Sequence, residues 1–206
     1  MSTRALRILA ATAAIVVGLA SFMSLSLAQE QRVRVRGVIE KVDGDTVMIK
    51  SVDGAELKLT LTANALIVGV NKATLADIGP GSFVGSTAMP QADGSQKAVE
   101  VHIFAESQRG AGEGHRPYTL PNSTMTNGTV GEMVTAADGG TLTVKYKDGE
   151  KKIVVPPSVP IVRYEIASRA DLVPGVHITA LNALRKGEGT FEAARLNVGR
   201  NGLVPQ

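Results

Sequence analysis

Short runs of alternating apolar and polar residues, separated by glycine-containing turns, are the main pattern of the chain. In residues 32–40, Val33 and Val35 alternate with arginines and, after Gly37, Ile39 precedes Glu40, as in a strand with one buried face. Asp-Gly pairs separate several runs, and glycine tolerates the positive φ that tight hairpin turns require. The pattern therefore predicts an all-β fold. In the first half of the chain, the expected strands are 32–40, 46–50, 56–62, 65–70, 82–89 and 98–104, with a helical turn over 73–78.

The strand pattern occurs twice along the chain. A shift of 95 residues places Asp43-Gly44 on Asp138-Gly139. A shift of 94 places Pro80-Gly81 on Pro174-Gly175. Matches in one order with a nearly constant offset indicate an internal repeat, and we predict two tandem OB-like β-barrels of five to six strands each. The expected segments are a signal helix (1–28), a first barrel (29–104), a linker containing Gly and Pro (105–126) and a second barrel (127–206).

Recurring turn and strand motifs are found at Arg36-Gly37-Val38, Val42-Asp43-Gly44, 46–50, 75–81, 124–130 and 142–157. They resemble an uncharacterised OB-like β-barrel domain family of exported bacterial proteins, and the last two resemble a two-domain subgroup sometimes labelled a metal ABC transporter permease. The resemblance implies a fold and an exported location, but no chemistry. A chain with one removable apolar segment cannot form a translocation path, so permease activity is not expected.

The N-terminal residues carry the features of an export signal. Arg4 and Arg7 precede residues 8–28, which contain no charge, and the small residues Ser26 and Ala28 suit a cleavage site. We predict that this segment is a cleaved secretory signal peptide and that the mature protein is periplasmic. An uncleaved segment is the alternative; it would be long enough to anchor the protein in a membrane, which is the only membrane contact expected.

Composition excludes several classes of site. The chain has 206 residues, of which 44% are hydrophobic and 3% aromatic, and it contains no cysteine. Disulfides, thiolate nucleophiles and cysteine zinc sites are therefore excluded. Without Arg4 and Arg7, 20 basic residues face 19 acidic residues, so net charge provides no general attraction for nucleic acid.

The first predicted strand carries three arginines on one face, Arg32, Arg34 and Arg36. Such a row could serve as a phosphate track or as part of a surface for an acidic partner. Binding of single-stranded nucleic acid also needs clustered aromatic side chains on which bases stack. The aromatic residues of the mature chain are scattered along the sequence, so no nucleic-acid partner is expected.

The histidines provide the candidate ligands, although none is spaced as a metal-binding pair. His102 lies on an expected strand, where a solvated or interdomain face is the simpler interpretation. His115 lies in the glycine-rich segment 105–126, which is either a spacer or a functional loop. We hypothesise that His115, Arg116 and Tyr118 dock between the barrels, where they either orient the barrels or form a small anion-binding site. A metal site would combine His115 with a carboxylate or with His102.

Motifs of catalysis are missing from the sequence. It contains no G-x-S-x-G elbow, no H-E-x-x-H zinc motif and no phosphate-binding glycine loop of established spacing. We therefore predict a non-enzymatic cell-envelope protein without a cofactor, which binds or scaffolds an unknown envelope protein or a small ligand. The alternative is a periplasmic accessory protein of a transport system that binds a metal or another small ligand.

Overall fold

The computed structural model describes residues 31–205, and this part of the chain consists of β-strands with three short 3-10 helices. The predicted all-β class is confirmed. The expected signal peptide, residues 1–28, lies outside the described residues. Within the described part, no helix has the length and apolar character needed to span a bilayer. The elements are β1 (Arg32–Asp43), β2 (Thr46–Ser51), β3 (Glu56–Ala73), η1 (Leu75–Asp77), β4 (Phe83–Pro90), β5 (Gln96–Ile103), η2 (Glu106–Gln108), β6 (Gly114–Pro117), β7 (Thr124–Ala136), β8 (Gly139–Tyr146), β9 (Gly149–Val155), β10 (Ile161–Ala167), η3 (Arg169–Asp171), β11 (His177–Gly187) and β12 (Thr190–Gly199).

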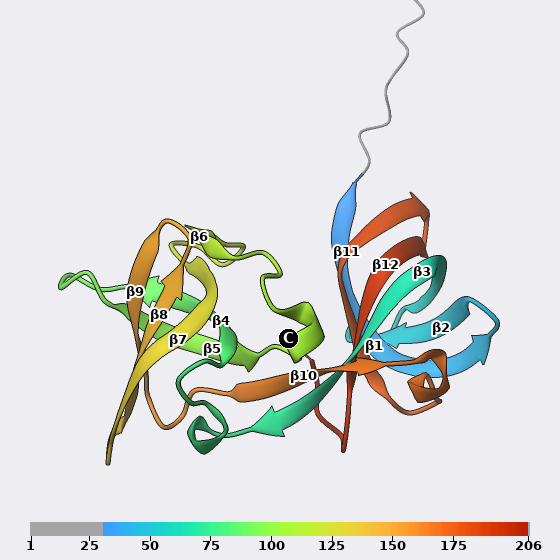
Figure 1. Cartoon of the computed structure of the whole chain (residues 1–206). Helices are drawn as coiled ribbons and strands as arrows, with labels where there is room; N and C mark the ends of the chain where they lie inside the picture. The colour runs from blue at the N-terminus through green and yellow to red at the C-terminus, as the bar shows by residue number, and fades with distance from the viewer. Residues whose placement is uncertain (1–30, 206) are drawn as a thin grey trace, which may run out of the picture.

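Five strands form a closed mixed barrel, at the right of Figure 1. Strands β11, β1, β2 and β3 are paired antiparallel in this order, and β12 pairs antiparallel with β11 and parallel with β3, which closes the barrel. Aliphatic side chains fill its interior, as the alternating pattern predicts. Fully buried members of this core are Ile39, Ile49, Leu59, Ile178 and Leu196.

The remaining strands except β10 form a second lobe, at the left of Figure 1. Its antiparallel order is β5-β4-β7-β8-β9, and β6 adds to β7. Strand β9 also meets β5 in parallel over two residue pairs, Gln96 with Ile153 and Lys97 with Val154. A separate apolar core, which includes Val84, Leu142 and Val144, fills this lobe.

The strand pairing crosses the expected boundary between residues 29–104 and 127–206. Strands β11 and β12, from the second segment, complete the barrel that β1, β2 and β3 begin. Strands β4 and β5, from the first segment, belong to the second lobe, where they pair with each other and β4 pairs with β7. This arrangement differs from a tandem one, in which each segment would close on itself.

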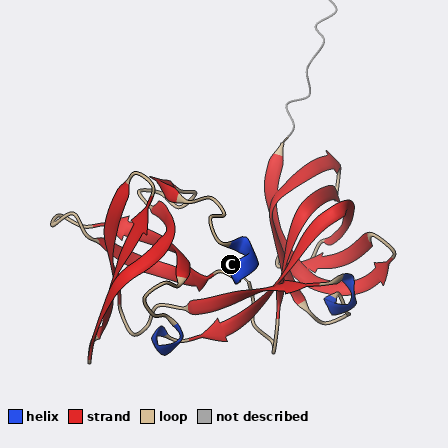
Figure 2. Ribbon diagram, viewed as in Figure 1, coloured by secondary structure: helices blue, strands red, loops and turns tan. Residues whose placement is uncertain are grey.

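The length of β3 accounts for this exchange. The sequence pattern predicts separate strands over 56–62 and 65–70, but the structure has one continuous strand, Glu56–Ala73. Strand β3 therefore leaves the barrel and carries the chain into the second lobe before β4 begins (Figure 2). The expected strandless linker, 105–126, also contains η2 and β6.

Strands β3 and β10 connect the two lobes. They pair antiparallel, with Val70 opposite Tyr164 at the centre of the pairing. This two-stranded junction continues into the barrel, where β12 pairs in parallel with β3. It continues into the second lobe, where β5 pairs in parallel with β10. Val70 and Tyr164 belong to a third, smaller apolar cluster at this junction. The junction is therefore hydrogen-bonded and packed, and it forms the base on which the functional site is built.

Candidate functional site between the barrel and the second lobe

Two adjoining cavities form a cleft between the barrel and the second lobe. They share five lining residues, namely His102, Tyr118, Met125, Tyr164 and Leu181. Strands β5, β6 and β7 contribute one wall, β1, β11 and β12 contribute the other, and β10 contributes Tyr164. The cavity on the Arg195 side has a volume of about 390 Å³, and the one on the Glu100 side has a volume of about 170 Å³. Ligand sites commonly lie in such clefts between packed units.

A buried histidine stands at the centre of the cleft. The ring of His102 stacks on Tyr164, with 4.8 Å between centroids and 16° between planes, and the edge of Phe104 contacts it at 4.8 Å. Burial lowers the pKa of His102 to about 3, so the imidazole is neutral near pH 7. Its Nδ1 atom has no hydrogen-bond partner among the described residues.

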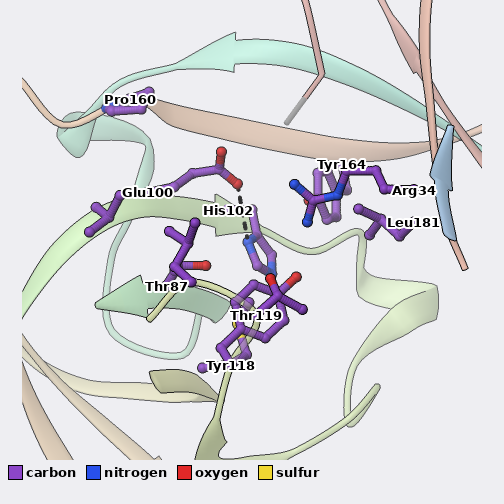
Figure 3. Close-up of a pocket in the computed structure, with 12 residues that line it drawn as sticks. Arg34, Thr87, Glu100, His102, Tyr118, Thr119, Pro160, Tyr164 and Leu181 are labelled. Atoms are coloured by element: carbon purple, nitrogen blue, oxygen red, sulfur yellow. Dashed lines mark ion pairs between the residues drawn. The ribbon is translucent and has the colours of Figure 1, made fainter. Parts of the chain in front are cut away.

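Glu100 lies beside this histidine, two residues earlier on the same face of β5. Its Oε1 atom is 3.9 Å from His102 Nδ1, and Figure 3 shows the carboxyl group directed at the imidazole ring. Burial raises the pKa of Glu100, while the charges of Arg34 and Arg36 oppose that shift. Glu100 is the one acidic residue among the described side chains that line the two cavities.

Arginines from several elements surround the same space. Arg32 of β1, Arg116 of β6 and Arg195 of β12 line the larger cavity, and Arg34 lines the smaller one. The guanidinium of Arg195 lies over the Tyr164 ring, 5.7 Å from its centroid, and Arg34 and Tyr164 both line the smaller cavity (Figure 3). The cleft is therefore strongly basic, although the mature chain is predicted to be nearly neutral. A local excess of guanidinium groups favours an anionic ligand.

A glycine makes room for the polar groups on the lobe wall. A Cβ atom at Gly85 would lie 2.1 Å from His102 Nε2 and 2.6 Å from Asn127 Oδ1. Asn127 is buried, and its Nδ2 donates a hydrogen bond to the carbonyl oxygen of Ala111 at 3.0 Å. Its Oδ1 has no partner among the described residues. An unpaired buried acceptor and an unpaired imidazole nitrogen indicate that this wall is built to receive a polar molecule.

Two of the three residues predicted for ligand binding lie in the cleft. Arg116 lines the larger cavity, and Tyr118 lines both cavities beside His102. Arg116 is held by a 2.7 Å hydrogen bond from its Nη1 to the carbonyl oxygen of Gly112. The segment 105–126 therefore contributes Arg116 and Tyr118 to the lining of the cleft.

His115 lies outside the cleft and is not brought together with His102. Its Nδ1 is 2.8 Å from Thr126 Oγ1, and its ring stacks at 6.4 Å on Tyr146. The reason is strand geometry, because adjacent residues of β6 point to opposite faces and Arg116 takes the cleft side. The predicted metal pair of His102 and His115 is therefore not formed. Among the described residues there is also no group of three or more His, Cys, Asp or Glu side chains that could hold a metal ion.

Several cleft residues were not singled out by the sequence pattern. The row of arginines on β1 was visible as one polar face, but its orientation toward Glu100 depends on how the lobes pack. Tyr164 and Arg195 are isolated in the sequence and meet His102 only because β10 and β12 run beside β5 and β3. No local sequence signal marks either residue.

The fold and the cleft define a two-lobed all-β protein, built on a closed five-stranded mixed barrel with extra strands. Comparisons with protein-family models, curated proteins and solved structures found no match. The geometry and charge of the cleft are therefore the basis for a functional proposal.

Proposed function

We propose that this protein is an exported, non-enzymatic binding protein of the cell envelope, and that its cleft holds a small anionic ligand. The observation that supports this most is the convergence of arginines from β1, β6 and β12 on a cleft in which Glu100 is the single acidic side chain among the described lining residues. Guanidinium groups donate charge-assisted hydrogen bonds to carboxylate or phosphate oxygens. These hydrogen bonds are stronger in a partly buried cleft than on an open surface.

The surroundings of His102 favour binding over catalysis. A general base must reach the group that it deprotonates, and it is usually oriented by a hydrogen bond on its other nitrogen. Within residues 31–205 the Nδ1 atom of His102 has no such partner, and the ring is held by stacking on Tyr164 instead. A neutral, stacked imidazole is suited to shaping a binding surface.

The envelope location in this proposal rests on the pattern of residues 1–28. A ligand-binding accessory of a transport system is the related alternative, and the cleft between two lobes favours its small-ligand form over its metal form, because His102 and His115 are separated. Identification of proteins or small molecules that co-purify with the native protein from envelope extracts would distinguish an accessory from an independent binding protein.

We also propose that the chain descends from a duplicated β-unit whose halves exchanged strands, so that the second lobe is a second, OB-like barrel. Matching register supports this idea. Leu196 pairs with Ile67 across β12 and β3, and Val101 pairs with Ile161 across β5 and β10. Val101 corresponds to Leu196 at the offset of 95, and Ile67 corresponds to Ile161 at the offset of 94.

Calorimetric titration with acetate, inorganic phosphate and citrate tests the proposed function. We expect at least one anion to bind the wild-type protein, and Arg116→Gln and Arg195→Gln each to weaken its binding about tenfold, which corresponds to one lost charge-assisted bond. Lys50→Gln is the matched control, because it removes an exposed positive charge from β2 outside the cleft. Equal weakening in all three variants would show a general charge effect and would contradict the proposal, as would the absence of binding by any of the anions.

A further inference from the structure

We propose that the ligand carries a protonated amine in addition to its anionic group, so that Glu100 binds the amine while the arginines bind the anion. This inference rests on the proposed function and specifies its ligand as a dipolar molecule, such as an aminoalkanoate.

The first evidence is that Glu100 forms no ion pair with a lysine or arginine in the part of the chain that the structure describes. Among the described residues, no lysine or arginine lies within the 4.0 Å distance of an ion pair with this carboxyl group. Its nearest titratable contact is His102, which is neutral, and the Glu100 side chain is only 15% exposed. Burial of a carboxylate beside a neutral ring costs free energy, which the charges of Arg34 and Arg36 offset only in part and which a bound cation would offset further.

The second evidence is that the acidic side chain stands at one end of the cleft and most of the arginines at the other. Glu100 lines only the smaller cavity, where Arg34 also lies, whereas Arg32, Arg116 and Arg195 line only the larger cavity. His102 and Tyr164, which line both cavities, lie between these ends. A dipolar molecule can satisfy both ends, whereas a simple anion would leave Glu100 unpaired.

The third evidence is the apolar character of the Glu100 end. Pro160 and Leu181 line it, together with Val99 and Leu120, which remain 40% and 44% exposed. Exposed aliphatic side chains at the mouth of a cavity suit an aliphatic segment of a ligand. A ligand with methylene groups between its amine and its anionic group would bury this surface and reach both charged ends.

A length series of simple probes tests this inference. The probes are 4-aminobutanoate, 6-aminohexanoate and 8-aminooctanoate, each compared by calorimetry with the alkanoate of the same length and with the matching alkylamine. We expect one aminoalkanoate to bind at least tenfold more tightly than its alkanoate, and the alkylamines not to bind. The best length then reports the separation between the two charged ends.

Variants separate the two charged ends. Glu100→Gln should reduce the affinity for the aminoalkanoate to that of the alkanoate, while Arg195→Gln should weaken both. Glu165→Gln, which removes an exposed carboxylate next to Tyr164 on β10, should change neither affinity. Thermal melting of each variant checks that it is folded.

The possible outcomes also distinguish this inference from the proposed function. Equal binding of alkanoates and aminoalkanoates at all three lengths, with both lost in Arg195→Gln, would overturn the dipolar ligand and leave an anion-binding cleft. Absence of binding by every probe, or binding unaffected by Arg195→Gln, would contradict the anion-binding proposal itself.

Discussion

The barrel and the second lobe have matching strand pairs but different side chains where those pairs meet the junction. In the second lobe, Gly85 lies between His102 on β5 and Asn127 on β7. In the barrel, Thr179 lies between Asn197 on β12 and Arg36 on β1. The glycine leaves space for an imidazole, whereas the threonine fills the corresponding position.

The segments that follow β5 and β12 add to this difference. In the barrel, Thr179 Oγ1 donates a 2.8 Å hydrogen bond to the carbonyl oxygen of Pro205, so the C-terminal segment covers this position. In the second lobe, Ala111 and Gly112 lie against Asn127 and line the cleft without closing it. A similar order of paired strands therefore supports a closed position at Thr179 and an open, polar position at Gly85, and the side chains account for the difference.

The largest expected effect comes from a feature that both halves share. A Cβ atom at Gly37 would lie 2.2 Å from the carbonyl oxygen of Lys50, and one at Gly128 would lie 2.3 Å from that of Lys145. Because the obstacle is backbone in both cases, Gly37→Ala and Gly128→Ala should each lower the free energy of unfolding by about 3 kcal/mol, measured by urea denaturation. A loss confined to one of the two variants would show that the halves do not depend on the same close approach.

The second-largest expected effect is a loss of stability that differs between the two halves. Gly85→Ala should destabilise the protein by about 2 kcal/mol, because the new methyl group displaces His102 or Asn127, whose side-chain ends can move. Thr179→Ala, the matched change in the barrel, should cost only about 1 kcal/mol through its lost hydrogen bond. Anion binding provides a second measurement, since Gly85→Ala should abolish it and Thr179→Ala should leave it intact. Loss of binding in both variants would contradict the contrast between the open position at Gly85 and the closed position at Thr179.

Much of the fold was predictable from the sequence because it depends on local rules. Alternation located the strands, and glycine turns located the hairpins. The exchange of strands was not predictable, because β4–β5 and β11–β12 have similar apolar patterns and either pair could complete either half. The deciding feature is that β3 continues through residues 63–65. Strand β12 pairs in parallel with β3 on both sides of this stretch, with a register shift between Ala193 and Arg195.

The candidate site was predictable only in part. Arg116 and Tyr118 stood out as unusual residues for a spacer, and they do lie in the cleft. His115 was grouped with them because 105–126 was read as strandless, whereas strand alternation at β6 turns His115 away. Glu100 and Arg195 acquire their importance from neighbours distant in the chain, so only the tertiary structure reveals them.

The stability of the cleft should depend on pH through His102. Burial places the folded-state pKa of His102 at about 3, below its ordinary value of 6.5. Protonation therefore favours the unfolded chain, and the stabilisation by the neutral ring is complete above pH 6.5 and is lost as the pH falls toward 3. The expected loss is roughly 1.4 kcal/mol for each pH unit in this range.

Urea denaturation between pH 7 and pH 4 measures this slope. His102→Asn, which introduces the residue found at the corresponding position 197, should remove most of the slope even if it lowers stability at pH 7. His115→Asn is the control, because His115 is only half-buried and should contribute less. An unchanged slope in His102→Asn would show that other groups govern the acid sensitivity.

The smallest expected effect comes from a cap that both halves again share. The backbone N–H groups of Thr74 and Ser168 each donate a 2.8 Å hydrogen bond to the carboxylate three residues later, Asp77 or Asp171. These bonds are the main reason that the pKa of each aspartate is lowered, so the stabilisation is present above the ordinary value of 3.8 and is lost as the pH falls below it.

Asp77→Asn and Asp171→Asn should each lower the melting temperature at pH 7 by about 3 °C, because an amide oxygen is a weaker acceptor than a carboxylate. Asp138→Asn, in the exposed turn between β7 and β8, should leave it unchanged. Asp171 also forms an ion pair with Arg200 at 2.9 Å, as Asp77 does with Arg163 at 3.1 Å, so the two losses should be similar. A much larger loss for Asp171 would mean that the segment after β12, which begins at Arg200 and covers the barrel position, depends on this cap, and that the two halves differ here as well.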